Sequence, residues 1–152
     1  MAYDPKRIID TANAFLLAAG RAMEQRPLGG NQFQMLPVPA VVCNAFAIEL
    51  YLKALLTLEG SPSSGHDLSA LFEKLQQPTR SVIHGRLKMN EADFAPQIAA
   101  VAKAFVEWRY IFEAGSIGVD LDFLVRLAKA AGDEALERLK TASHSSPSGA
   151  PG

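Results

Sequence analysis

One long apolar run dominates this chain and limits the folds open to it. The segment "VPAVVCNAFAIELYLKALLTLEG", residues 38–60, is apolar almost all the way round, yet it carries Glu49 and Lys53 near its middle. A helix that is apolar on every side belongs inside a protein core or a membrane. The two charges interrupt the roughly 18 uncharged residues that a membrane span needs. We therefore expect the central helix of a globular core and no membrane partner.

Composition supports a single globular domain. The chain has 152 residues, of which 49% are hydrophobic, so it can bury a core without disulfides or structural metals. Its net charge of −1 does not indicate broad nucleic-acid binding, although a local basic face stays open. Cys43 is the single cysteine, which favours a small buried side chain and a cytoplasmic location. We see no secretion signal, no metal-ligand spacing and no cofactor motif.

Helical periodicity accounts for most of the remaining chain, and strand signals are almost absent. We predict an all-α fold, an up-and-down bundle of four main helices plus one or two short ones, forming one domain over residues 1–141. Residues 142–152 are rich in Ser, Pro and Gly and are predicted to be disordered. The predicted helices cover residues 5–26, 39–59, 68–75, 79–90, 91–115 and 119–140. Asp4-Pro5 is the expected cap of the first of them, and Asp67 is the expected cap of the third.

Two features of this plan leave alternatives open. Gly132-Asp133 could split the last helix, because that pair reads as a helix stop followed by a new cap. The loop over residues 27–38 is long for a compact domain and holds Phe33, Met35 and Leu36. Its apolar side chains either pack onto the bundle or form a contact surface.

The charges in the apolar helix need partners, since a lone buried charge is costly. Glu49 and Lys53 are four residues apart and share one helix face. Arg109 and Glu113 have the same spacing in the fifth predicted helix, so the two pairs could form a four-membered ionic network. His66, which precedes the Asp67 cap, could approach the same cluster.

Three sequence pieces together resemble the HEPN family of bacterial and archaeal helical-bundle proteins: "ELYLKALL", "GHDLSALFEKL" and "WRYIFE". The resemblance covers about residues 40–125. It implies a helical bundle that forms a homodimer and acts on RNA or nucleotides. HEPN proteins include RNA-cleaving toxins, partners of minimal nucleotidyltransferases and non-catalytic RNA-binding forms.

The catalytic HEPN pattern is Arg, four to six residues, then His, and this chain departs from it. Counted from Arg109, the required positions hold Ala114, Gly115 and Ser116. Arg138 and His144 fit formally, but we expect that pair to run from a helix end into a disordered tail. Nothing would then hold the two side chains in place for chemistry.

Arg80 and His84 are one residue too close for the same pattern. With Arg86 and Lys88 they form a short basic run, which is usually a solvated face. The missing pattern puts ribonuclease activity in doubt without affecting the predicted fold.

We predict a non-catalytic HEPN-like module that binds RNA, a nucleotide or a partner protein, in a toxin–antitoxin or defence setting. The expected binding residues are Glu49, Lys53, His66, Arg109, Tyr110 and Glu113. One alternative is an RNA-cleaving toxin with a displaced active site, with His66, Arg109 and Glu113 as its catalytic candidates. Another is a helper subunit of a nucleotidyltransferase encoded by a neighbouring gene, or a partner of an antitoxin. The same charged cluster could instead be purely structural and fix helix packing.

Overall fold

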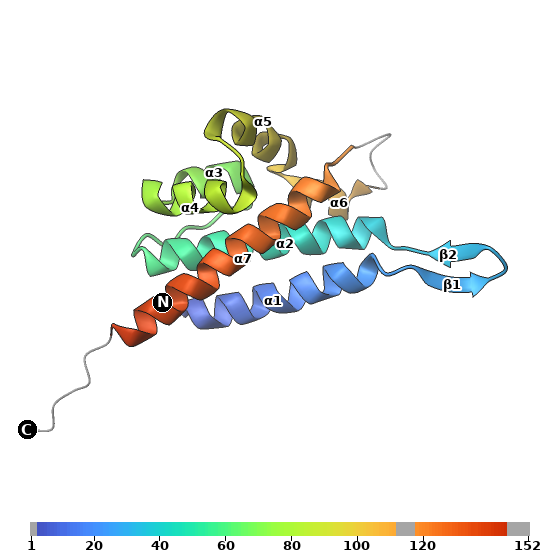
Figure 1. The fold of residues 1–152 in the computed structure, drawn as a ribbon, viewed down its shortest axis with the longest axis horizontal. Coiled ribbons are helices and arrows are strands. Elements are labelled where there is room, and N and C mark those ends of the chain that lie inside the picture. The colour runs from blue at the N-terminus through green and yellow to red at the C-terminus, as the bar shows by residue number, and fades with distance from the viewer. Residues whose placement is uncertain (1–2, 112–117, 146–152) are drawn as a thin grey trace, which may run out of the picture.

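The computed structural model describes residues 3–111 and 118–145 of the chain and is mostly helical (Figure 1). The predicted all-α class is confirmed in this broad sense, with two short strands added. The elements in chain order are α1 (Pro5–Ala22), β1 (Arg26–Gly29), β2 (Gln32–Gln34), α2 (Pro37–Leu58), α3 (Leu68–Glu73), α4 (Gln77–Leu87), α5 (Glu91–Val101), α6 (Ala104–Arg109) and α7 (Leu121–His144).

Helix α2 lies at the centre of the fold, which explains why its sequence is apolar on every side. It contacts α1, α3, α6 and α7, and Figure 1 shows α1 and α2 extending along the long axis while α7 runs obliquely across them. Ile48, Leu52, Leu55 and Leu56 on α2 are fully buried. Burying each such side chain contributes about 1.5–3 kcal/mol. The prediction of a central core helix is therefore confirmed.

By length and composition alone, α2 is also the one helix in the described part of the chain that could cross a membrane. Within its most apolar window, 61% of the residues are buried inside the protein. Most of this window is thus buried against other parts of the same chain.

The loop predicted over residues 27–38 contains an antiparallel hairpin, so the expectation of no strands is wrong here. Pro27 pairs with Phe33, and Gly29 and Gly30 turn the chain with φ of 107° and 59°. Such positive φ values are open to glycine without strain. The hairpin extends beyond the helices at one end of the molecule (Figure 1). Because both strands are exposed along their whole length, no burial pattern in the sequence marks them.

The helix predicted over residues 91–115 is broken, so the molecule does not have the four long helices expected. Helix α5 ends at Val101, and α6 begins at Ala104 after a turn at Ala102 and Lys103. The carbonyl of Ala102 accepts a hydrogen bond from the Leu68 amide at 2.8 Å, which ties the turn to the start of α3. The helical hydrogen bonding of α5 therefore ends where the chain bonds to a segment that is distant in sequence.

Helix α7 is continuous through Gly132 and reaches His144, so the possible split is wrong and the helix passes the expected limit at residue 141. Gly132 is buried in the middle of the helix and faces Tyr51 of α2. The rest of the predicted disordered tail, residues 146–152, lies outside the described residues.

The same helix corrects the expectation about Arg138 and His144. Both lie on ordered turns of α7 and each has its own partner. The guanidinium of Arg138 donates to Thr79 Oγ1 at 2.8 Å, and His144 Nδ1 lies 2.7 Å from the Lys140 carbonyl. Six residues apart on one helix, they do not share a face.

Candidate functional site

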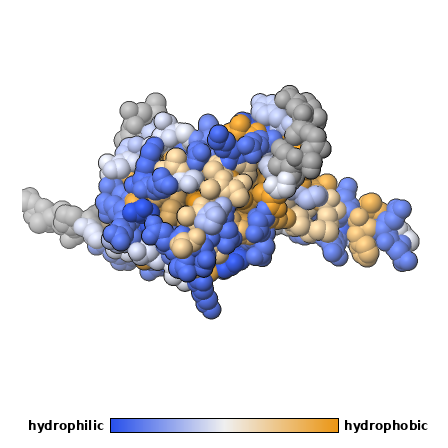
Figure 2. All heavy atoms as spheres, turned by 90° about the horizontal axis from the view of Figure 1, so that it is seen from above, coloured by the Kyte–Doolittle hydropathy of each residue, from blue (hydrophilic) through white to orange (hydrophobic). Residues whose placement is uncertain are grey.

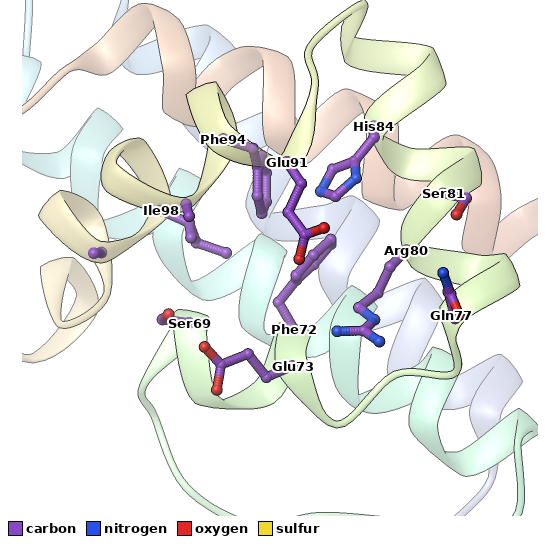
Figure 3. A pocket seen from close by; sticks show the side chains of 12 residues that line it. Ser69, Phe72, Glu73, Gln77, Arg80, Ser81, His84, Glu91, Phe94 and Ile98 are labelled. Carbon is purple, nitrogen blue, oxygen red and sulfur yellow. The ribbon is translucent and has the colours of Figure 1, made fainter.

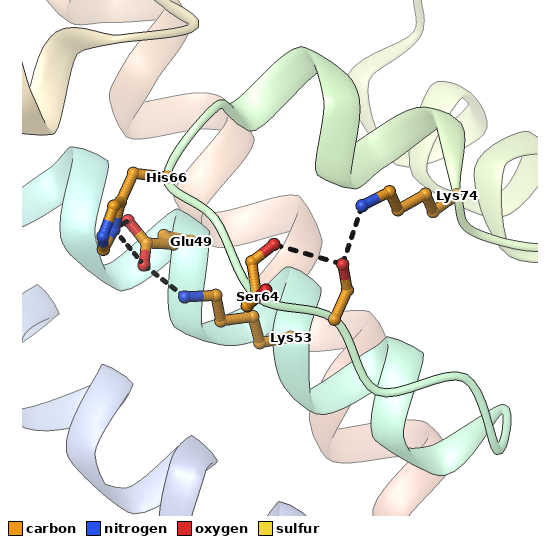
Figure 4. Close-up of polar contacts among 6 residues, drawn as sticks. Glu49, Lys53, Ser64, His66 and Lys74 are labelled. Atoms are coloured by element: carbon orange, nitrogen blue, oxygen red, sulfur yellow. Dashed lines mark hydrogen bonds and ion pairs between the residues drawn. The ribbon is translucent and has the colours of Figure 1, made fainter.

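Glu49 is the buried centre of a polar cluster between α2 and the segment that leads into α3. Its side chain is only 1% exposed, and Lys53 Nζ donates to Glu49 Oε1 at 2.6 Å. His66 Nδ1 lies 3.0 Å and 3.1 Å from the two carboxylate oxygens (Figure 4). The structure thus brings together Glu49, Lys53 and His66, and two partners offset the cost of burying the carboxylate.

The loop before α3 holds His66 in place. Asp67 caps α3 by accepting a hydrogen bond from the Ala70 amide at 2.9 Å, as its position in the sequence predicts. Earlier in the loop, Ser63 Oγ accepts a hydrogen bond from Lys74 Nζ at 2.8 Å (Figure 4). These two hydrogen bonds hold the chain before and after His66.

Because Nδ1 of His66 faces Glu49, Nε2 lies on the opposite side of the ring. The His66 side chain is 58% exposed, so solvent reaches it. With a proton on Nδ1, His66 donates to the carboxylate and keeps Nε2 available as an acceptor. Doubly protonated, it presents a cationic N–H at that position.

Arg109 does not join the predicted four-membered network. Within residues 3–111 and 118–145 it makes no ion pair with Glu49, and its guanidinium carbon lies 4.5 Å from the centre of the Phe105 ring. The break between α5 and α6 sets the direction of this short helix, so Arg109 packs on an aromatic ring of its own helix. Glu113, the fourth predicted member, lies outside the described residues.

Phe105, which the sequence analysis did not single out, connects the two parts of the site. Its ring is stacked on Phe46 at 4.6 Å and lies 6.0 Å from the His66 ring. Phe105 and Arg109 are four residues apart, a spacing that places them on one helix face. That spacing is the signal that could have identified the pair.

Tyr110 extends the aromatic part of this surface. Its side chain is 51% exposed, and its ring centre lies 5.5 Å from the Arg109 guanidinium carbon. We refer to His66, Phe105, Arg109 and Tyr110, with Glu49 and Lys53 beneath, as the His66–Arg109 surface. It combines cationic nitrogens with aromatic rings.

Groups of His, Cys, Asp and Glu that could hold a metal ion do not occur in the described part of the chain. The side chains of the His66–Arg109 surface can hydrogen-bond to anionic oxygens and stack on planar groups. Comparison with protein-family models, with curated proteins and with solved structures finds no match to this chain.

Proposed function

We propose that this chain is a non-catalytic helical module that binds RNA at the His66–Arg109 surface. The observation that carries the proposal is the position of the Arg109 guanidinium, 4.5 Å over the Phe105 ring, which in turn lies 6.0 Å from the ring of the exposed His66. Single-stranded RNA is recognised by stacking of its unpaired bases on aromatic rings and on Arg guanidinium planes. Arg109 supplies donors for the adjacent phosphate, and the His66 ring can add a further polar contact.

The charge of the chain limits the affinity of such binding and its dependence on salt. The chain carries a net charge of −1, so a few local cations, rather than an extended basic field, would contact the backbone. With about two phosphate contacts, the logarithm of the affinity falls against the logarithm of salt with a slope of about −1.4 for a single strand. We expect modest affinity with a shallow salt dependence.

Fluorescence anisotropy with a short labelled single-stranded RNA tests the proposal. Binding should be measured between about 50 and 200 mM salt and compared with a mononucleotide as competitor. Arg109→Gln and His66→Ala should each weaken RNA binding about tenfold, which corresponds to about 1.4 kcal/mol. Arg7→Gln removes an exposed charge on α1 and serves as the matched control.

The outcomes separate the alternatives. If the mononucleotide displaces the labelled RNA as well as an unlabelled RNA strand does, the ligand is a nucleotide instead of an RNA strand. If neither binds, and Arg109→Gln changes only the unfolding free energy, the surface is structural or contacts a protein partner.

A second candidate function, RNA cleavage, is favoured by the Glu49–His66 contact. A buried carboxylate that orients an imidazole with one free nitrogen is the arrangement of a general base. This version predicts growth arrest on expression, relief of the arrest by His66→Ala, and shortened RNA products in vitro. Healthy growth together with intact RNA would exclude it and leave the binding function.

The proposal includes a homodimer, as the resemblance to HEPN proteins implies. The hairpin exposes Leu28 and Phe33, each 61% accessible, and apolar colour appears on the projecting arm in Figure 2. Beside it, a groove of about 600 Å³ between α1 and α2 is lined by Leu17 and Cys43 among others. Burial raises the pKa of the Cys43 thiol, which favours a neutral packing role.

The occupant we propose for this groove is the hairpin of a second copy. The groove is bordered by Arg21, Glu24 and Arg26, so it carries charges of both signs. In a two-fold dimer the same groove of each copy contributes to the interface, and such a mixed set of charges can be complementary to itself. Light scattering should show a dimer that Phe33→Ser converts to a monomer. Val82→Ser, an exposed apolar position on α4, is the control. We place the dimer in the cytoplasm, in keeping with its single cysteine.

A further inference from the structure

A second cavity lies between α3, α4 and α5 and shares no residue with the His66–Arg109 surface. Its volume is about 400 Å³, within the range of small-molecule sites. The buried side chains of Phe72, Phe94 and Ile98 contribute apolar lining. The Phe72 and Phe94 rings lie 4.5 Å apart, so one side of the cavity is aromatic.

Two nitrogen atoms beside this cavity are buried without hydrogen-bond partners among the described residues: Arg80 Nε and His84 Nε2. Both side chains come from one face of α4 and line the cavity (Figure 3). Buried polar nitrogens normally have a hydrogen-bond partner, so α4 presents two unusual side chains here. Because these two atoms are themselves covered, a carboxylate in the cavity would contact Arg80 through the outer Nη atoms of its guanidinium, with the His84 ring beside it.

Acidic side chains face Arg80 and His84 from the other two helices. Glu73 of α3 and Glu91 of α5 also line the cavity (Figure 3), and neither forms an ion pair with Arg80 in the part of the chain that the structure describes. Burial lowers the pKa of His84; Glu91 raises it in part and Arg80 lowers it further. The cavity therefore presents a guanidinium and two carboxylates that are not paired with each other.

We propose that this cavity binds a small zwitterion of the amino-acid class with an apolar side chain. The carboxylate of the ligand accepts hydrogen bonds from the outer guanidinium nitrogens of Arg80, and its ammonium group lies near Glu73 and Glu91. The apolar side chain packs on Phe72, Phe94 and Ile98. A phosphate dianion fits poorly, because two carboxylates at the same site repel it.

Calorimetry and NMR with L-phenylalanine and L-leucine test this proposal on the full chain. We expect at least one of them to bind and to shift the His84 ring resonances. Two analogues probe the charges: 3-phenylpropionate lacks the ammonium group, and phenethylamine lacks the carboxylate. Each should bind at least tenfold more weakly than L-phenylalanine. Absence of binding by both amino acids, or equal binding of L-phenylalanine and either analogue, would overturn the proposal.

Variants locate the site. Arg80→Gln should reduce amino-acid binding at least tenfold without lowering the melting temperature, because it removes a buried nitrogen that has no partner. Glu91→Gln, at an exposed position, should weaken binding of the amino acid while leaving 3-phenylpropionate unaffected. Arg7→Gln is again the control. If Arg80→Gln lowers the melting temperature and leaves binding unchanged, Arg80 is structural and the proposal fails.

Discussion

A Cβ atom on Gly132 of α7 would lie 2.9 Å from Cζ of Tyr51 on α2. Real Cβ atoms do not approach other atoms so closely, so the glycine permits this approach of the two helices. Tyr51 is fixed in turn, because its hydroxyl donates to Asn13 Oδ1 on α1 at 2.5 Å. Burial, followed by the nearby Asp133, raises the pKa of Tyr51 to about 12, so the phenol stays a donor at neutral pH.

Gly132→Ala should destabilise the protein by about 1–3 kcal/mol through overpacking against Tyr51. Helix propensity alone predicts the opposite sign, a gain of about 1 kcal/mol for alanine over glycine. Urea unfolding followed by circular dichroism measures the difference.

The matched control is Gly20→Ala, in a helical position of α1 where an added Cβ meets nothing within 4 Å. It should stabilise the protein by about 0.4–1 kcal/mol. Equal effects of the two substitutions would contradict the packing role of Gly132.

Lys53→Met should destabilise the protein more than the double variant Glu49→Leu/Lys53→Met. The single change leaves a carboxylate that is 1% exposed with His66 as its remaining partner. Breaking a buried pair costs about 3–5 kcal/mol, whereas replacing both partners by apolar residues is often neutral. Since Lys53 is partly exposed, we expect about 1–3 kcal/mol for the single variant. If the change in unfolding free energy of the double variant equals the sum of the changes of the two single variants, Glu49 and Lys53 are not coupled.

Thr79→Val should cost about 1–3 kcal/mol, because it leaves two partners unsatisfied. Thr79 is 1% exposed; its hydroxyl donates to Glu59 Oε1 at 2.5 Å and accepts from Arg138 Nη1 at 2.8 Å. Thr11→Val, at an exposed position of α1, should change the unfolding free energy by less than about 0.5 kcal/mol. Comparable losses at the two sites would argue against the Thr79 contacts.

His84 should make the protein less stable as the pH falls from 7 to 5. Burial lowers its pKa in the folded state, so the unfolded chain binds the proton more readily below its ordinary pKa. Folding stability therefore decreases as the pH falls through this window. Between pH 7 and pH 5 the unfolding free energy of the wild type should fall more than that of His84→Gln, because the variant lacks the titrating ring. If the unfolding free energy of His84→Gln changes with pH as steeply as that of the wild type, the pH dependence does not come from His84.

The local spacing of charges is what the sequence predicted best. Glu49 and Lys53 lie on one helix face, and His66 meets them, because four-residue spacing and a cap at Asp67 are local rules. The position of Arg109 was not predictable in this way. Arg109 follows the break at Ala102, where the Leu68 amide, from a segment far away in the chain, donates a hydrogen bond.

The remaining errors have similar causes. Gly132 reads as a helix stop unless one knows that Tyr51 packs against it. Arg80 and His84 read as part of a solvated basic run unless α3 and α5 are placed beside them. In each case the sequence indicated the residue type, and packing between helices determined its role.

The central position of α2 also matters for biosynthesis. Its most apolar window, which would pass for a membrane segment by composition, is covered in part by α7, and α7 is made last among the described elements. A nascent chain that ends before α7 therefore leaves part of this window open to water, chaperones or the membrane-insertion machinery. The core around α2 is therefore closed only when α7 packs on it.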